Sequence, residues 1–267
     1  MRNVARSLPG AAGGILLAAM LSSCGGSDVA KNLPAPERFR VAMEKFGHGD
    51  YLEAVSDFQI IKLQYPGSAY ADSAQYFLGE CHYRQEEYLL AVEEYQALQR
   101  NFRSSPLVAD GLFKIGMCYY DLSPKPTLDQ TYTKKAIESF QSFIDLYPTH
   151  QLVKQAEDNI KELNNKLSQK LYDGGRLYMK MEYYKSAIKY FDAVMDEYHD
   201  TPFAEPAHIE KVKALMSRKH FAEAADEINK FIEKYPHSSL MDDATSLKRR
   251  IDDELGHPSA ASAPAGH

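Results

Sequence analysis

The chain has 267 residues, of which 25% are charged and 44% hydrophobic, the ordinary composition of a packed protein. Its formal net charge of -6 does not support nucleic-acid binding, because a phosphate-binding face needs clustered lysine and arginine. The length is compatible with one or two compact domains or with one elongated array.

The N-terminus has the pattern of a bacterial lipoprotein signal. Two arginines precede an uncharged, mostly apolar run at residues 11–21, which is too short to span a bilayer as a mature helix. The run ends in a Leu-Ser-Ser-Cys sequence that resembles a lipobox and ends at Cys24. The resemblance implies removal of a signal peptide at 1–23, acylation of Cys24 with palmitate or a similar chain, and an outer-membrane location, since Gly25 rather than Asp follows. An ordinary secretory signal is the alternative.

The rest of the chain is a repeat of helical hairpins. The segment from Tyr76 to Tyr83 matches the segment from Phe113 to Tyr120 at an offset of 37 residues, a period typical of helical-hairpin solenoids. An alanine followed four residues later by a large apolar residue occurs five times, at Ala54/Phe58, Ala91/Tyr95, Ala136/Phe140, Ala187/Phe191 and Ala224/Ile228. The alanine lets two helices approach, and the large residue fills the space one turn away. This pattern predicts an all-α, right-handed solenoid of five tetratricopeptide-like hairpins with a C-terminal capping helix.

The repeat also predicts the domain boundaries. An aromatic residue, usually followed by proline, closes each unit, because proline cannot continue a helix. After a lipidated tether at 24–35, the units are expected at 36–66, 67–103, 104–148, 149–199 and 200–238, followed by a capping helix at 239–255 and a disordered tail at 256–267.

Two units are longer than the others. The third has two prolines between Ser123 and Gln130, which predict a loop between its helices. The fourth has apolar residues at helical spacing from Leu152 to Leu171, without proline or glycine between them. We interpret this segment as one first helix of about six turns that projects beyond its neighbours.

Two cysteines follow Cys24. Cys81 and Cys118 occupy equivalent places in adjacent units. Equivalent sites on stacked helices lie about 8–10 Å apart, too far for a disulfide, so we expect two buried free thiols.

The sequence offers candidate binding residues but no catalytic motif. No metal, cofactor or phosphate-loop motif is present, and we do not expect an enzyme. The inner face of a solenoid is its usual binding surface, and in the first three units it carries aromatic residues that suit an extended peptide. These candidates are Phe39, Phe46, Tyr76, Tyr83, Phe113 and Tyr120. The same rings could instead pack between the repeats, and the sequence leaves both readings open.

The combination of lipobox, tether, five units, long fourth-unit helix and third-unit loop resembles the BamD/YfiO/ComL family over about residues 24–250. The resemblance implies a scaffold of the outer-membrane β-barrel assembly machinery on the periplasmic face. The first units would capture the C-terminal signal strand of unfolded outer-membrane proteins, and the last units would dock on the POTRA domains of a BamA-like barrel protein. The candidate docking residues are Tyr172, Arg176, Met179, Lys180 and Tyr190.

One candidate departs from the family. Tyr190 stands where the best-studied members have a docking arginine, and Arg176 and Lys180 are the nearest replacements. The alternative functions are a periplasmic scaffold for cell-wall or division machinery and, less well matched, a sugar-capture lipoprotein of the SusD type.

Overall fold

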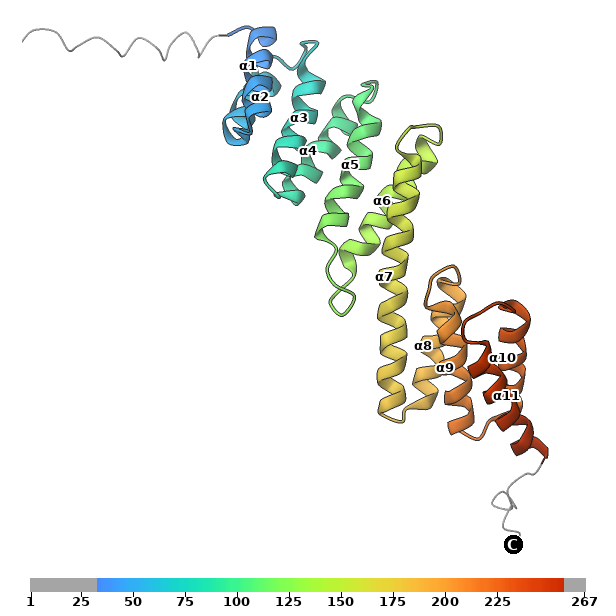
Figure 1. Ribbon diagram of the computed structural model, residues 1–267. Coiled ribbons are helices and arrows are strands. Elements are labelled where there is room, and N and C mark those ends of the chain that lie inside the picture. The colour runs from blue at the N-terminus through green and yellow to red at the C-terminus, as the bar shows by residue number, and fades with distance from the viewer. Residues whose placement is uncertain (1–32, 257–267) are drawn as a thin grey trace, which may run out of the picture.

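The computed structural model describes residues 33–256, and this part of the chain is entirely helical (Figure 1). The helices are α1 (Ala35–His48), α2 (Tyr51–Gln64), α3 (Ala71–Arg84), α4 (Tyr88–Asn101), α5 (Leu107–Leu122), α6 (Thr131–Leu146), α7 (Val153–Lys180), α8 (Tyr184–Glu197), α9 (Ala204–Ser217), α10 (Phe221–Lys234) and α11 (Met241–Gly256). The predicted signal peptide, Cys24, most of the tether and the tail beyond Gly256 lie outside the described residues.

The helices form an elongated stack in which each helix contacts the next along the chain (Figure 1). The pairs α1/α2, α3/α4, α5/α6, α7/α8 and α9/α10 are five hairpins, numbered one to five below. Helix α11 contacts both α9 and α10 and covers the end of the stack. The prediction of an all-α array with a capping helix is confirmed. The cap buries Ala244, Leu247 and Ile251 against the stack, whereas Leu255 near its end is 47% exposed.

The helices cross at the predicted alanines. Ala54, Ala91, Ala136, Ala187 and Ala224 are all 0% exposed. In three hairpins the large residue that follows the alanine lies directly on a glycine of the first helix. A Cβ atom on Gly79, Gly116 or Gly175 would lie 2.5–2.6 Å from the ring of Tyr95, Phe140 or Phe191 respectively. Only glycine therefore permits this close approach.

The turns within hairpins share one backbone conformation. The residue before the second helix's N-cap is left-handed at Gly49, with φ 87°, and at Glu86, Glu182 and Lys219, each with φ 61°. In the first hairpin this turn runs through His48, Gly49 and Asp50. The third hairpin differs because its two prolines replace the tight turn with the predicted loop.

Helix α7 is longer than expected. It has 28 residues, about eight turns rather than six, because it continues through Gly174 and Gly175. Its first part packs on α5 and α6 and its last part on α8 and α9, so α7 connects hairpins one to three with hairpins four and five (Figure 1).

The loop of the third hairpin is held against α7. Lys166 donates to Ser123 Oγ at 2.9 Å, and Lys170 donates to the Leu128 carbonyl at 2.5 Å. Within the loop, the buried side chain of Gln130 donates to the carbonyls of Lys125 and Leu128. The loop is therefore a fixed part of the junction between the third and fourth hairpins.

Buried polar pairs link the two helices in three hairpins. The partners are 19 residues apart in each case: Arg38 with Asp57 at 2.7 Å, Gln75 with the Glu94 carbonyl at 3.0 Å, and His208 with Glu227 at 2.5 Å. A buried polar group is costly unless it is hydrogen-bonded, so each pair favours one register of its hairpin.

Cys81 and Cys118 are buried free thiols, as predicted. Burial, with a smaller contribution from nearby acidic groups, raises the pKa of each thiol to about 12.

Candidate docking surfaces

The predicted groove aromatics of the first hairpin take part in packing between hairpins. The ring centroids of Phe39 and Phe46 lie 6.2 and 5.3 Å from that of Phe77 on α3. All three rings are half-buried against the core formed around Phe58. They fill the space between the first helices of hairpins one and two and still present part of their surface to solvent.

In the second hairpin, Tyr76 and Tyr83 surround a buried ion pair. Glu80 accepts a hydrogen bond from Tyr95 and pairs with Lys114 of α5 at 2.8 Å. Lys114 also lies 4.8 Å from the ring centroid of Tyr83. Burial and then the charge of Glu80 raise the pKa of Tyr76, so this phenol stays neutral.

The hydroxyl of Tyr83 is also used within the stack. It donates to Asp121 of α5 at 2.6 Å. Tyr83 is half-buried, and its hydroxyl is already hydrogen-bonded within the stack.

In the third hairpin the two groove candidates differ. The prediction that Phe113 lines the groove is wrong, because its side chain is 4% exposed. Its ring packs edge-on against Phe143 and tilted against Phe140. Tyr120 is half-buried, and burial followed by a hydrogen bond to Glu162 of α7 raises its pKa to about 12.

The predicted docking residues on hairpin four divide into packed and exposed groups. Tyr172 packs against Phe191 and Phe203, with centroid distances of 5.9 and 5.6 Å, and Met179 packs on the same core. Tyr190 lies over Gly174, where a Cβ atom would lie 2.7 Å from its ring. These three side chains stabilise the hairpin, while Arg176 and Lys180 are exposed.

The most exposed apolar surface of hairpin four lies at its tip. Leu177, Met181 and Tyr183 are 57%, 50% and 58% exposed, at the end of α7 and in the following turn. With Arg176 and Lys180 they form what we call the hairpin-four patch. These three apolar residues were not predicted, because the candidates were taken only from the positions of each first helix that face the inner side of the solenoid.

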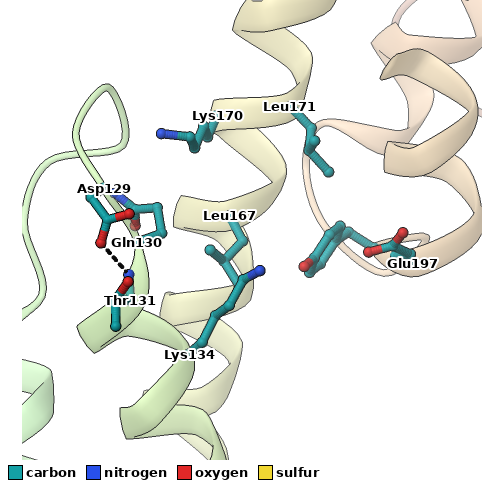
Figure 2. Close-up of a pocket in the computed structure, with 9 residues that line it drawn as sticks. Asp129, Gln130, Thr131, Lys134, Leu167, Lys170, Leu171 and Glu197 are labelled. Carbon is teal, nitrogen blue, oxygen red and sulfur yellow. Dashed lines mark hydrogen bonds between the residues drawn. The ribbon is translucent and has the colours of Figure 1, made fainter. Parts of the chain in front are cut away.

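A cavity of about 300 Å³ lies at the junction of hairpins three and four (Figure 2). It is lined by Asp129, Gln130, Thr131 and Lys134 from the third hairpin, by Leu167, Lys170 and Leu171 from α7, and by Glu197 and Tyr198 from the end of α8. Sequence reasoning placed the loop beside Asp129 and Gln130 but could not place a cavity there, because its walls come from three elements.

No helix among residues 33–256 is long and apolar enough to cross a membrane. Within the same residues no cluster of His, Cys, Asp and Glu has the arrangement of a metal site.

The fold and these surfaces define a tetratricopeptide-like interaction scaffold. The family model described as "YfiO: Outer membrane lipoprotein" matches residues 31–214 and 169–249. The chain belongs to this outer-membrane lipoprotein family, and the resemblance inferred from the sequence is confirmed.

Two solved structures similar to the chain contain tetratricopeptide repeats. The TPR2AB domain of yeast Sti1, in a complex with pHSP90, is 17% identical with a TM-score of 0.42, over 85% of this chain and 94% of that chain. A tetratricopeptide repeat protein from Parabacteroides merdae is 16% identical with a TM-score of 0.36, over 83% and 73%. A search of curated proteins gave no match.

Proposed function

We propose that this protein is a non-enzymatic scaffold of the outer-membrane β-barrel assembly machinery, anchored through acylated Cys24 at the periplasmic face. Hairpins four and five bind the POTRA domains of a BamA-like barrel protein. Hairpins one to three bind unfolded outer-membrane proteins. Membership of the outer-membrane lipoprotein family supports the setting.

The hairpin-four patch is the observation on which the docking proposal depends. Leu177 near the end of α7, Met181 directly after it and Tyr183 in the following turn are each at least half exposed, and Arg176 and Lys180 are their neighbours along the chain. Apolar side chains that gather on a surface and are rimmed by charge are typical of protein interaction sites. Because α7 continues beyond the third hairpin, this tip stands clear of hairpins one to three (Figure 1). A partner can therefore bind here without covering the inner face of those hairpins.

The substrate proposal depends on the half-buried rings of α1 and α3. Phe39, Phe46 and Phe77 are half-buried rings, and Tyr76 and Tyr83 are half-buried with their hydroxyls already hydrogen-bonded within the stack. An unfolded outer-membrane strand alternates apolar and polar residues. Such a strand can place alternate side chains on these rings, as extended peptides do in other binding grooves.

Affinity purification of the tagged protein from detergent-solubilised envelopes tests the docking proposal. We expect co-purification of a barrel protein with POTRA domains. Replacing both Leu177 and Tyr183 by alanine should reduce its recovery about tenfold, because interface energy is concentrated in a few apolar and aromatic anchors. The matched control is Leu63→Ala, since Leu63 on α2 is 76% exposed and distant in the stack. Recovery of only peptidoglycan-synthesis or division proteins would instead support the alternative scaffold function.

A further inference from the structure

Four leucines are exposed on the second helices of hairpins one and two, and we call them the leucine face. Leu52 and Leu63, near the two ends of α2, are 71% and 76% exposed. Leu89 and Leu90, at the start of α4, are 49% and 51% exposed. Single exposed leucines are ordinary, but exposed leucines that gather on neighbouring hairpins are typical of a surface that meets an apolar partner.

On α2 the leucines belong to an uncharged stripe. Residues that follow one another at intervals of four, three and four share one side of a helix, and along α2 such a set is exposed throughout: Leu52, Ser56, Gln59 and Leu63. The adjacent Lys62 is paired with Glu94 of α4 at 2.7 Å. The stripe extends about 16 Å along the helix. Its length and lack of charge suit a broad surface rather than a pocket.

The leucines are confined to the two hairpins nearest the proposed acylation site. Counted from the buried alanine of each hairpin, the place of Leu52 and Leu89 is occupied in hairpins three to five by other residues: Lys134, Lys185 and Ala222. The place of Leu63 is occupied in all the other hairpins by charged residues: Arg100, Asp145, Asp196 and Glu233. The repeat itself therefore does not require leucine at these places. The partner of the leucine face is one that hairpins one and two meet.

The proposed anchor keeps this face near a membrane. Leu33 is nine residues after Cys24, and nine residues of chain span at most about 32 Å. The Leu33 carbonyl accepts a hydrogen bond from Tyr65 Oη at 3.1 Å, so the chain joins the stack beside the end of α2. Acyl chains inserted at Cys24 would hold the leucine face close to the bilayer, where a weak contact is favoured by its high effective concentration.

We propose that the leucine face lies on the membrane into which acylated Cys24 is inserted, with its four side chains among the lipid headgroups and upper acyl chains. The inference rests on the proposed acylation and adds a second membrane contact, made by the folded chain. Glu53 directly follows Leu52, Glu93 is one turn after Leu89, and both are exposed. Anionic headgroups would repel these carboxylates, so the favoured surface is a zwitterionic one. Two contacts fix the direction in which the stack leaves the membrane.

Tryptophan fluorescence in vesicles tests this proposal, because the chain has no tryptophan of its own. The acylated full-length protein with Leu52→Trp is reconstituted into vesicles of phosphatidylethanolamine and phosphatidylcholine, with or without bromine on the upper acyl chains. Bromine quenches only a nearby ring. We expect bromine to lower the emission about twofold, because an apolar face at the interface enters the lipid by about 5–10 Å. Quenching should weaken when phosphatidylglycerol replaces phosphatidylcholine.

The matched control is Leu255→Trp, since Leu255 is 47% exposed on α11 at the other end of the stack (Figure 1). Its emission should not respond to bromine, and equal quenching at both positions would overturn the proposal. Adding Leu89→Ser and Leu90→Ser to the Leu52→Trp protein should remove most of the quenching, because the apolar contact is reduced. Unchanged quenching in that variant would contradict a contact made by this face.

Flotation of the same vesicles separates the anchor from the leucine face. Protein that floats with the vesicles but shows no quenching at Leu52→Trp would overturn the membrane contact and leave the acyl anchor intact. Protein that does not float would overturn both the proposed anchor and the contact that rests on it.

Discussion

Two adjacent glycines in α7, Gly174 and Gly175, allow the close packing of α7 against α8 to be tested within one helix turn. Gly175 lies under Phe191, which is 0% exposed, and a new Cβ atom would lie 2.5 Å from the ring. Gly174 lies under the half-buried ring of Tyr190, at 2.7 Å. Alanine in place of glycine favours a helix by about 1 kcal/mol at either position. Overpacking a closed core costs about 1–3 kcal/mol, and the buried Phe191 ring cannot move aside.

The 2.5 Å approach places Gly175→Ala at the upper end of this cost, about 2–3 kcal/mol. After the helix gain is subtracted, we expect a loss of about 1–2 kcal/mol of folding free energy, which lowers the Tm by about 2–8 °C in a chain of this size. Gly174→Ala should stay within about 0.5 kcal/mol of the parent protein or gain stability, because Tyr190 can rotate toward solvent. Urea unfolding followed by far-UV circular dichroism measures both variants. A Gly175→Ala protein as stable as the parent would refute the close contact between these helices.

Three further predictions concern the turns, a buried ion pair and the thiols. Glu86→Gly should raise the free energy of unfolding by about 0.5–1 kcal/mol in urea titrations, because the left-handed conformation at this position is unfavourable for residues other than glycine. No gain would show that the turn is unstrained. Burial raises the pKa of Glu227, but hydrogen bonds from His208 and Lys211 outweigh burial and hold the pKa at about 2, below its ordinary 4.5. The stability that this carboxylate contributes is complete above about pH 4.5 and is lost as the pH falls toward about 2. Between about pH 5 and about pH 3 the urea midpoint of the parent protein should therefore fall more steeply than that of Glu227→Gln. Parallel slopes would contradict this. Cys81 and Cys118, each with a pKa of about 12, should react with a thiol reagent at pH 8 only after unfolding in guanidinium, and fast reaction of the folded protein would contradict their burial.

The fold could be predicted because the helix-crossing residues repeat in the sequence. An alanine with a large residue four positions later records a local contact, and Ala54 and Ala224 occupy the same place in the first and last hairpins. The full length of α7 was underestimated, because the six turns were counted only over the apolar run from Leu152 to Leu171 and the helix ends at Lys180. Gly174 and Gly175 lie within it, and their lack of side chains permits the packing of Tyr190 and Phe191.

The binding surfaces were harder to predict because exposure depends on neighbouring hairpins. Phe39 and Phe113 have equivalent positions in the repeat, yet Phe39 is half-buried and Phe113 is in the core. The difference comes from the rings supplied by other helices, Phe77 in one case and Phe143 in the other. Tyr183 was not predicted as a docking residue, because its exposure depends on how far α7 extends beyond the neighbouring hairpins. No local sequence pattern indicates this.

Site-specific photo-crosslinking in living cells tests whether hairpin four docks the protein on a barrel subunit. A photoreactive residue replaces Tyr183 in one strain and the equally peripheral Leu63 in another. We expect the probe at Tyr183 to crosslink to the POTRA domains of a β-barrel protein and the probe at Leu63 not to do so. Crosslinks from Tyr183 only to peptidoglycan-synthesis or division proteins would contradict it.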